Sequence, residues 1–245
     1  MPHCKNRQTK KYELIEKTLD KSDFSPIWFL IIIVSGSIYF GVKGVSENDI
    51  PIKISENTPT VILVVQVLLL FTLLFTTRKD SFNILKSGWT IDSTKLPIDI
   101  FGGIITGAIL AILYFYIFSP LQTYLQINIG DYVPSGETMT VLGKQSILFF
   151  IANVLFAPYV EESLYRNYTL TRFLEKYGST KSIIFTVTMF GLLHWVGGLW
   201  YILMTGLLVG LPFAIIAIKR KNIVWVFVAH LTLNLLEFIY ITTKT

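Results

Sequence analysis

Residues 58–77 read Thr-Pro-Thr-Val-Ile-Leu-Val-Val-Gln-Val-Leu-Leu-Leu-Phe-Thr-Leu-Leu-Phe-Thr-Thr, a stretch that is rich in Val, Leu and Phe and holds no charge. A helix needs about 20 apolar residues to cross the hydrocarbon core of a bilayer. The whole chain has a similar character, since 52% of its 245 residues are hydrophobic and only 15% are charged. A soluble domain carries about 25% charged residues. The stretch is therefore predicted to be one span of a polytopic membrane protein.

Six further apolar runs lie on either side of this stretch. They cover residues 26–42, 98–121, 145–160, 182–196, 199–218 and 222–241. The first and the fifth of the seven runs are short, and only Gly197-Gly198 separates the fifth from the sixth. We predict an all-α polytopic transmembrane helix bundle with about seven spans.

Basic residues are divided unequally between the alternate connections of this arrangement. With the N-terminus inside, the inner segments hold sixteen Lys and Arg residues and the outer segments hold four, with Arg166 left out as a candidate for burial. Cytoplasmic loops carry an excess of Lys and Arg. We therefore expect the N-terminus inside and the C-terminus outside. The net charge of +5 then reflects cytoplasmic loops, and no nucleic-acid partner is expected.

Ionisable and amide residues within or beside the later runs are few and clustered. They are the string Val160-Glu161-Glu162-Ser163-Leu164-Tyr165-Arg166 after the fourth run, His194 in the fifth, and His230, Asn234 and Glu237 in the seventh. A charged side chain inside a span costs about 2.5–3.5 kcal/mol, so such residues are functional candidates by default. Glu162 and Arg166 lie four residues apart, so they share a helix face and can pair. The three polar residues of the seventh run also share one face.

The depth of these residues can be estimated from a rise of 1.5 Å per residue. His194 and Asn234 each lie about 20 Å beyond the lysine at the inner end of their run. Glu161 reaches a matching depth, about 22 Å, only if its helix continues to Lys176. The three residues can therefore meet only if the fourth helix is long.

The sequence after the fourth run supports such a helix. Residues 167–175 contain neither Pro nor Gly. We predict one fourth helix about 45 Å long, with a kink at Pro158 and with Arg166 buried.

Each polar residue also has a plainer explanation when it is taken alone. A lone histidine in a span is commonly a packing residue, and the Glu162–Arg166 pair could only stabilise its helix. Asn234 could bridge two helices, and Glu237 lies near an outer end where water could solvate it. Two adjacent acids, an arginine, two histidines and an asparagine at matching depth are difficult to explain in this way. We therefore favour a functional site.

Three strings in the chain resemble the pattern of the CPBP family, the CAAX-processing and bacteriocin-processing intramembrane proteases, also called Abi or Rce1-like. The strings are Glu161-Glu162-x-x-x-Arg166, Phe190-x-x-x-His194 and His230-x-x-x-Asn234. The resemblance covers about residues 145–241. With the apolar runs and the charged N-terminal segment, we expect three regions. They are a cytoplasmic polar tail at residues 1–25, N-terminal transmembrane helices at 26–144 and a catalytic transmembrane core at 145–245.

The resemblance implies peptide-bond hydrolysis within the membrane. Glu161 would be the general base that activates water, and His194 would help to hold that water. His230 and Asn234 would stabilise the oxyanion. The remaining site residues would be Glu162 and Arg166, which organise the site, and Phe190, which packs at the cavity wall. Carboxylates are suited to such proton transfer, and His and Asn donors to stabilising developing negative charge.

The family is often described as a metalloprotease, and the cofactor is left open between zinc and none. Glu161, His194 and His230 could hold Zn²⁺ and leave one position for water. However, these ligands lie on three different helices, and no His-Glu-x-x-His motif occurs in the chain.

The expected activity is that of an intramembrane endopeptidase acting on a peptide or membrane-associated protein. One alternative is a non-catalytic bacteriocin-immunity or regulatory membrane protein on the same scaffold. The complete set of motif residues favours catalysis, because a pseudoenzyme is expected to lose at least one of them. A transporter or proton channel would also use buried carboxylates and histidines, but the chain has neither repeat symmetry nor a broken-helix pair.

The composition leans towards Lys, Ile and Asn, which indicates an AT-rich bacterium and thus a multi-pass protein of a bacterial cell membrane. Peptide pheromones, bacteriocin precursors or cell-envelope proteins are then better candidate substrates than prenylated proteins of the eukaryotic kind.

Overall fold

The computed structural model describes residues 25–46, 53, 57–89, 92–133 and 145–244. All regular structure within these ranges is helical, so the predicted all-α class is confirmed for the described part of the chain. The predicted polar tail lies outside the described residues, except for Ser25 at the start of the first helix.

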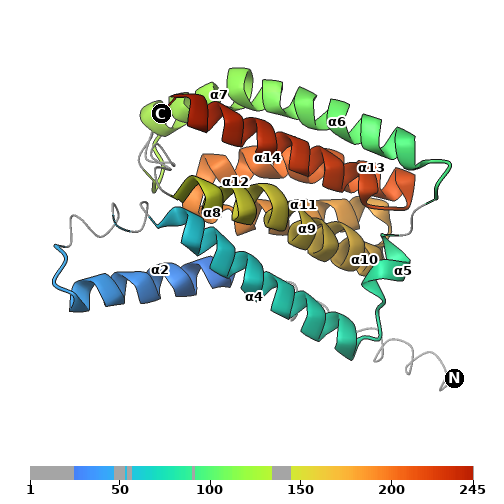
Figure 1. Ribbon diagram of the computed structural model, residues 1–245, viewed down its shortest axis with the longest axis horizontal. Helices are drawn as coiled ribbons and strands as arrows, with labels where there is room; N and C mark the ends of the chain where they lie inside the picture. The colour runs from blue at the N-terminus through green and yellow to red at the C-terminus, as the bar shows by residue number, and fades with distance from the viewer. Residues whose placement is uncertain (1–24, 47–52, 54–56, 90–91, 134–144, 245) are drawn as a thin grey trace, which may run out of the picture.

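The described residues of the N-terminal half form five α-helices, one of them a single turn, and one π-helical segment. They are α2 (Ser25–Val42), α4 (Thr58–Lys79), the short α5 (Ile84–Ser87), α6 (Leu96–Leu113), the π-helical segment η1 (Tyr114–Phe118) and α7 (Ser119–Asn128). Figure 1 shows α6 and α7 as one long rod beside α14, and α2 and α4 on the opposite side of the bundle.

The C-terminal half fills the space between these two layers (Figure 1). Its elements are α8 (Ser146–Phe149), η3 (Phe150–Phe156), α9 (Ala157–Glu161), η4 (Glu162–Thr169), α10 (Leu170–Tyr177), α11 (Ser179–Leu193), η5 (Trp195–Gly197), α12 (Leu199–Thr205), η6 (Gly206–Gly210), α13 (Leu211–Arg220) and α14 (Val224–Lys244). Of these, η3, η4 and η6 are π-helical and η5 is a single 3₁₀ turn.

Five helices among the described residues are long and apolar enough to cross a membrane, which makes this an integral membrane protein. They are Thr58–Lys79, Leu96–Asn128, Ser146–Tyr177, Leu199–Arg220 and Val224–Thr243. The expected count of about seven is not confirmed. The fifth apolar run forms α11, whose 15 residues cover only about 22 Å, and a hydrocarbon core is about 30 Å thick.

The predicted long fourth helix is confirmed. Residues Ser146–Tyr177 form one continuous helix of 32 residues, ending at Gly178, whose φ of +76° suits a glycine. Its π-helical segments lie on both sides of Pro158, which has no N–H to donate to the preceding turn. Wider π turns of this kind are frequent at functional sites. The second of them, Glu162–Thr169, begins at the predicted site residues.

Two glycines bring α6 against α14. A Cβ at Gly103 would lie 2.7 Å from the carbonyl oxygen of Trp225, and a Cβ at Gly107 would lie 2.4 Å from that of Ala229. The Gly-x-x-x-Gly spacing allows the backbones of two membrane helices to approach this closely. Since α14 carries two predicted site residues, the close packing of α6 against α14 helps to hold these residues in place.

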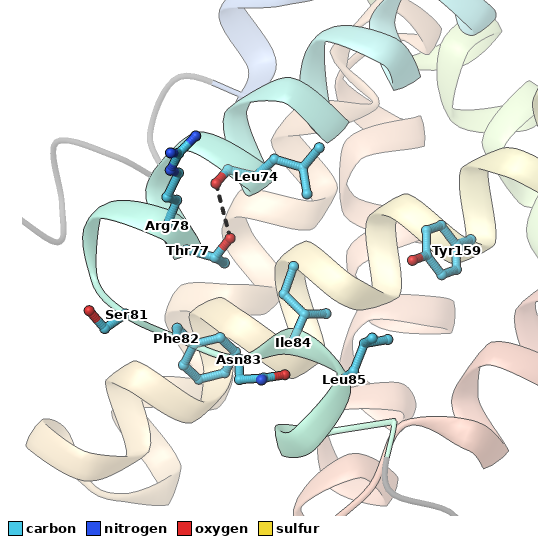
Figure 2. A pocket seen from close by; sticks show the side chains of 9 residues that line it. All are labelled: Leu74, Thr77, Arg78, Ser81, Phe82, Asn83, Ile84, Leu85 and Tyr159. Carbon is cyan, nitrogen blue, oxygen red and sulfur yellow. Dashed lines mark hydrogen bonds between the residues drawn. The ribbon is translucent and has the colours of Figure 1, made fainter.

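A groove of about 500 Å³ lies near the C-terminal end of α4 (Figure 2). Residues at the end of α4, the following turn and α5 line it together with Tyr159 of α9. The Tyr159 ring stacks on Trp89 at 5.4 Å, and Trp89 Nε1 donates to the Ser163 hydroxyl. None of the predicted site residues lines this groove.

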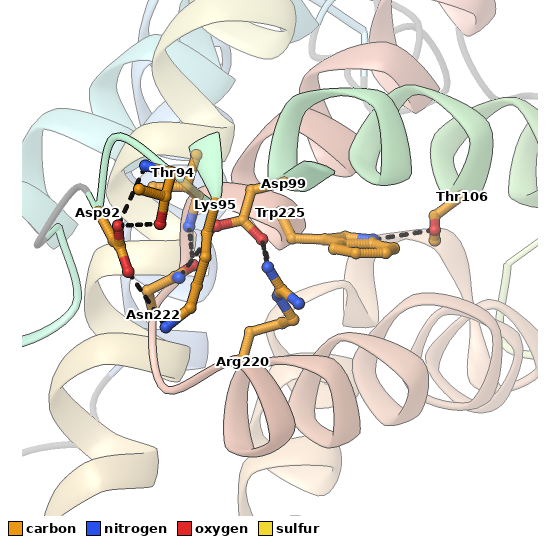
Figure 3. Close-up of polar contacts among 9 residues, drawn as sticks. Asp92, Thr94, Lys95, Asp99, Thr106, Arg220, Asn222 and Trp225 are labelled. Atoms are coloured by element: carbon orange, nitrogen blue, oxygen red, sulfur yellow. Dashed lines mark hydrogen bonds and ion pairs between the residues drawn. The ribbon is translucent and has the colours of Figure 1, made fainter. Parts of the chain in front are cut away.

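A polar network joins the start of α6 to the turn between α13 and α14 (Figure 3). The buried Asp99 carboxylate accepts hydrogen bonds from Arg220 Nε at 2.7 Å and Asn222 Nδ2 at 3.1 Å. Asn222 Oδ1 accepts from the Val224 N–H at the start of α14. The α4–α6 connection and the α13–α14 turn therefore meet at one end of the bundle.

Candidate active site

A buried ionic network occupies the middle of the bundle. Arg166 Nη1 donates to Glu162 Oε1 at 3.2 Å, and His230 Nδ1 lies 2.8 Å from the same oxygen. The Glu162 side chain is fully buried, and that of Arg166 is 1% exposed. The predicted pairing of Glu162 with Arg166 and the predicted burial of Arg166 are therefore confirmed. A carboxylate is the natural acceptor for an imidazole N–H, so Glu162 fixes the orientation of His230.

Glu161 lies next to this network but has a different partner. Its Oε1 accepts a hydrogen bond of 2.6 Å from Gln66 Nε2, which belongs to α4. Its Oε2 is buried and has no hydrogen-bond partner within the described part of the chain. Gln66 was not among the predicted site residues. The available signal was a single side-chain amide in an uncharged run that is rich in Val, Leu and Phe.

His194 lies directly after the last residue of α11, Leu193, and is half-buried. The predicted run to residue 196 was therefore too long. The helix stops because the chain turns through Gly197 and Gly198, and Gly198 has a φ of +99°. His194 Nδ1 lies 2.8 Å from the Phe190 carbonyl oxygen. Because that oxygen can only accept, Nδ1 carries the proton in this contact and Nε2 can accept.

Phe190 connects the two histidines with the ionic network. Its ring centroid lies 4.9 Å from that of His194 and 6.2 Å from that of His230. The guanidinium carbon of Arg166 lies 4.0 Å from the same ring centroid, which is a cation–π contact. Phe190 is 1% exposed. A single buried ring therefore sets the spacing of three polar side chains.

Asn234 faces the fourth helix from α14, one helical turn after His230. Its Nδ2 donates to the Asn153 carbonyl oxygen at 2.7 Å, within the π-helical segment η3. The Asn234 amide has a second N–H that can donate elsewhere. Glu237, one turn further along α14, is half-buried. Both His230 and Asn234 thus point towards the helix that carries Glu161 and Glu162.

A loop from the N-terminal half holds the turn that follows His194. The Asp131 carboxylate accepts from the N–H groups of Leu199 and Trp200, the first residues of α12. Burial opposes ionisation of Asp131, but these backbone donors prevail and lower its pKa below the ordinary value. The Tyr132 hydroxyl also donates to the Trp195 carbonyl oxygen. The loop therefore fixes the end of α11 from outside the predicted site.

The side chains proposed from the sequence as zinc ligands do not converge on one point. Within the described ranges, no group of three His, Cys, Asp or Glu side chains could hold a metal ion. Of the three proposed ligands, His230 contacts Glu162 through Nδ1 and Glu161 contacts Gln66 through Oε1, which leaves His230 Nε2 and Glu161 Oε2 for other contacts. Because the three side chains do not form one group among the described residues, their arrangement does not fit zinc.

Fold and site together define an integral membrane protein of the helical-bundle class, with acids, an arginine and histidines meeting inside the bundle. Residues 143–236 match the family model described as type II CAAX prenyl endopeptidase Rce1-like. This region is therefore an Rce1-like domain, and the resemblance carried by the three strings is confirmed. The matched region has the scaffold of a CAAX-type intramembrane protease.

The matched region contains all seven motif residues, whereas α4 with Gln66 and the loop with Asp131 lie before it. No curated protein and no solved structure matches the chain.

Proposed function

We propose that this protein is an intramembrane endopeptidase that hydrolyses a peptide or a membrane-associated protein. The observation that carries the proposal is the state of the Glu161 carboxylate. It is 4% exposed, it is held through one oxygen, and its other oxygen is buried without a partner in the described part of the chain. Such a carboxylate can take a proton from water without first rearranging the side chain.

In the proposed reaction, Glu161 Oε2 takes a proton from water as the water oxygen attacks the scissile carbonyl carbon. His194 Nε2 can accept a hydrogen bond from the same water, because its Nδ1 is engaged with Phe190. The electrons of the carbonyl π bond move to the carbonyl oxygen, which becomes an oxyanion. When the tetrahedral intermediate collapses, the C–N bond breaks and Glu161 returns its proton to the leaving amine.

Asn234 and His230 are the proposed donors to the oxyanion. The second N–H of the Asn234 amide can donate to it. When His230 carries both protons, Nδ1–H stays on Glu162 and Nε2–H can donate to the oxyanion. Arg166 balances the charge of Glu162 and keeps that carboxylate in place for His230. Glu162, Arg166 and Phe190 therefore position the groups that act on the substrate.

The proposed topology has about seven helical segments embedded in the membrane, the short α11 among them, with the N-terminus inside, in a bacterial cell membrane. The connection before α6 and the turn after α13 both carry basic residues, and they meet through Asp99 and through the Ile223 N–H bonded to the Gly88 carbonyl oxygen. Basic segments on one side of the membrane are expected from the positive-inside rule. The substrates in such a membrane would be peptide precursors or cell-envelope proteins.

Replacement of His194 or Asn234 by Ala is expected to abolish processing of the natural substrates, because each change removes a group that touches water or oxyanion. Proteins and secreted peptides would be compared by mass spectrometry of their termini in cells with the wild-type chain, each variant, or no chain. Wild-type cells should contain cleaved termini that the other cells lack. If the termini are the same in all these cells at equal membrane levels of the chain, the proposal is wrong.

Processing is expected to survive removal of metal ions, because the predicted ligands do not converge. The purified protein would be treated with a strong chelator, checked by elemental analysis and assayed on a substrate found as above. Activity within about twofold of the untreated protein is expected. Loss of activity on stripping, with recovery on addition of Zn²⁺ alone, would contradict the metal-free site.

A further inference from the structure

Helix α4 was expected only to span the membrane, yet it places a polar side chain at the centre of the bundle. Gln66 is 2% exposed. Burying an amide without hydrogen bonds costs free energy in any apolar environment. The position of Gln66 therefore calls for a partner, and its Nε2 donates to Glu161 Oε1 at 2.6 Å.

The buried face of α4 explains why this residue meets the fourth helix. Gln66, Leu69 and Leu73 are spaced i, i+3 and i+7, so they lie on one face of α4. All three are buried, and α4 packs along the fourth helix from α8 to η4. Two leucines thus hold the helices together, and the amide fills the remaining place on that face, opposite Glu161.

The hydrogen bond from Gln66 determines which oxygen of the Glu161 carboxylate is available. It occupies Oε1 of Glu161 and leaves Oε2 as the oxygen that can receive a proton. Both Glu161 Oε2 and Gln66 Oε1 are buried acceptors without a partner in the described part of the chain. The two atoms without a partner are therefore both acceptors, which suits a donor such as water, and the second N–H of Gln66 Nε2 remains as a donor beside them.

We infer that Gln66 is a positioning residue for Glu161, so that the active site extends beyond the Rce1-like region onto α4. This inference rests on the proposed function, in which Glu161 activates water. A misplacement of about 1 Å at a reacting group can cost 10²-fold in rate. Loss of the amide should therefore lower the rate of the chemical step without weakening substrate binding.

The test replaces Gln66 by Met, which keeps the length and volume of the side chain but removes the donor. Gln122→Met on α7 is the matched control, because Gln122 is also buried in the bundle but has no part in the proposed chemistry. For Gln66→Met, kcat should fall by about 10–100-fold and KM should change by less than about twofold. For Gln122→Met, both constants should stay near the wild-type values.

Gln66→Asn provides a second variant with a more conservative change, since its shorter amide cannot reach Glu161. It should show the same fall in kcat if Gln66→Met does not fold. Unchanged kcat in a folded Gln66 variant, or an effect on KM alone, would overturn the inference.

The contact is also tested without activity, by the thermal unfolding of Gln66→Met, Glu161→Gln and the double variant. Non-additive changes in melting temperature report the hydrogen bond itself. If the wild-type protein cleaves nothing but the changes at Gln66 and Glu161 are non-additive, the proposed function is wrong. The positioning role of Gln66 then fails with it, although the hydrogen bond between the two residues exists. Additive changes together with unchanged kcat in an active enzyme would overturn the inference alone.

Discussion

Glu161→Gln is expected to lower kcat by about 10²–10⁴-fold, the usual contribution of a general base. The substitution keeps the shape of the side chain and removes its ability to take a proton. Glu161 is buried at the end of α9, beside the Glu162–Arg166 pair but not part of it. The variant should therefore fold and enter the membrane at the wild-type level. Steady-state kinetics with the purified protein in lipid would measure the effect.

Glu175→Gln is the matched control for this variant. Glu175 lies on the same continuous helix, but its side chain is 60% exposed and pairs with Arg172 at the surface. The same chemical change there should leave kcat within about twofold, because an exposed ion pair contributes little. Equal activity of Glu161→Gln and Glu175→Gln would mean that Glu161 is not the base.

Arg166→Met is expected to destabilise the protein by about 3–5 kcal/mol. The change leaves the Glu162 carboxylate buried beside His230 and removes the cation–π contact between Arg166 and Phe190. Removing one charge of a buried pair destabilises a protein more than removing both, because the remaining charge stays buried without its partner. Thermal or denaturant unfolding in detergent would measure the change.

The double variant Glu162→Gln/Arg166→Met tests whether the unpaired charge of Glu162 causes this destabilisation. It removes both charges, so it should be more stable than Arg166→Met alone. If Arg166→Met unfolds at the wild-type temperature, the pair is not buried in the folded protein. Glu175→Gln, which disrupts an exposed pair on the same helix, should shift stability by less than about 1 kcal/mol.

The fourth helix and its ion pair could be predicted because the information is local. Residues 167–175 lack Pro and Gly, and a spacing of four places Glu162 and Arg166 on one helix face. Burial of Arg166 followed from the depth at which Glu161 had to lie. The three motif strings supplied the rest of the candidate site.

Other features depend on contacts between segments that are far apart, and these could not be predicted. Gln66 and Glu161 are separated by 95 positions, and a single amide in an apolar run does not indicate its partner. The end of α11 at Leu193 depends on the turn through Gly198 and on the Asp131 loop that binds the start of α12. The hydropathy pattern alone extended this run too far, because Trp195 and Val196 are as apolar as the helix before them.

The packing of α6 against α14 could be predicted only in part. The Gly103-x-x-x-Gly107 spacing in α6 is visible in the sequence and is a known signal for close helix contact. The partner of this signal, the α14 backbone at Trp225 and Ala229, is visible only in the structure.

In the proposed reaction, Glu161 activates a water molecule that cleaves a peptide bond. The most direct test is a single-turnover reaction of the protein in lipid vesicles with a substrate, in water enriched in oxygen-18. With the wild-type protein, the new C-terminal carboxylate should carry oxygen-18 from the solvent, and Glu161→Gln should form no such product in the same time. Labelled product at the same rate from Glu161→Gln, or no cleavage by the wild-type protein, would contradict this role of Glu161.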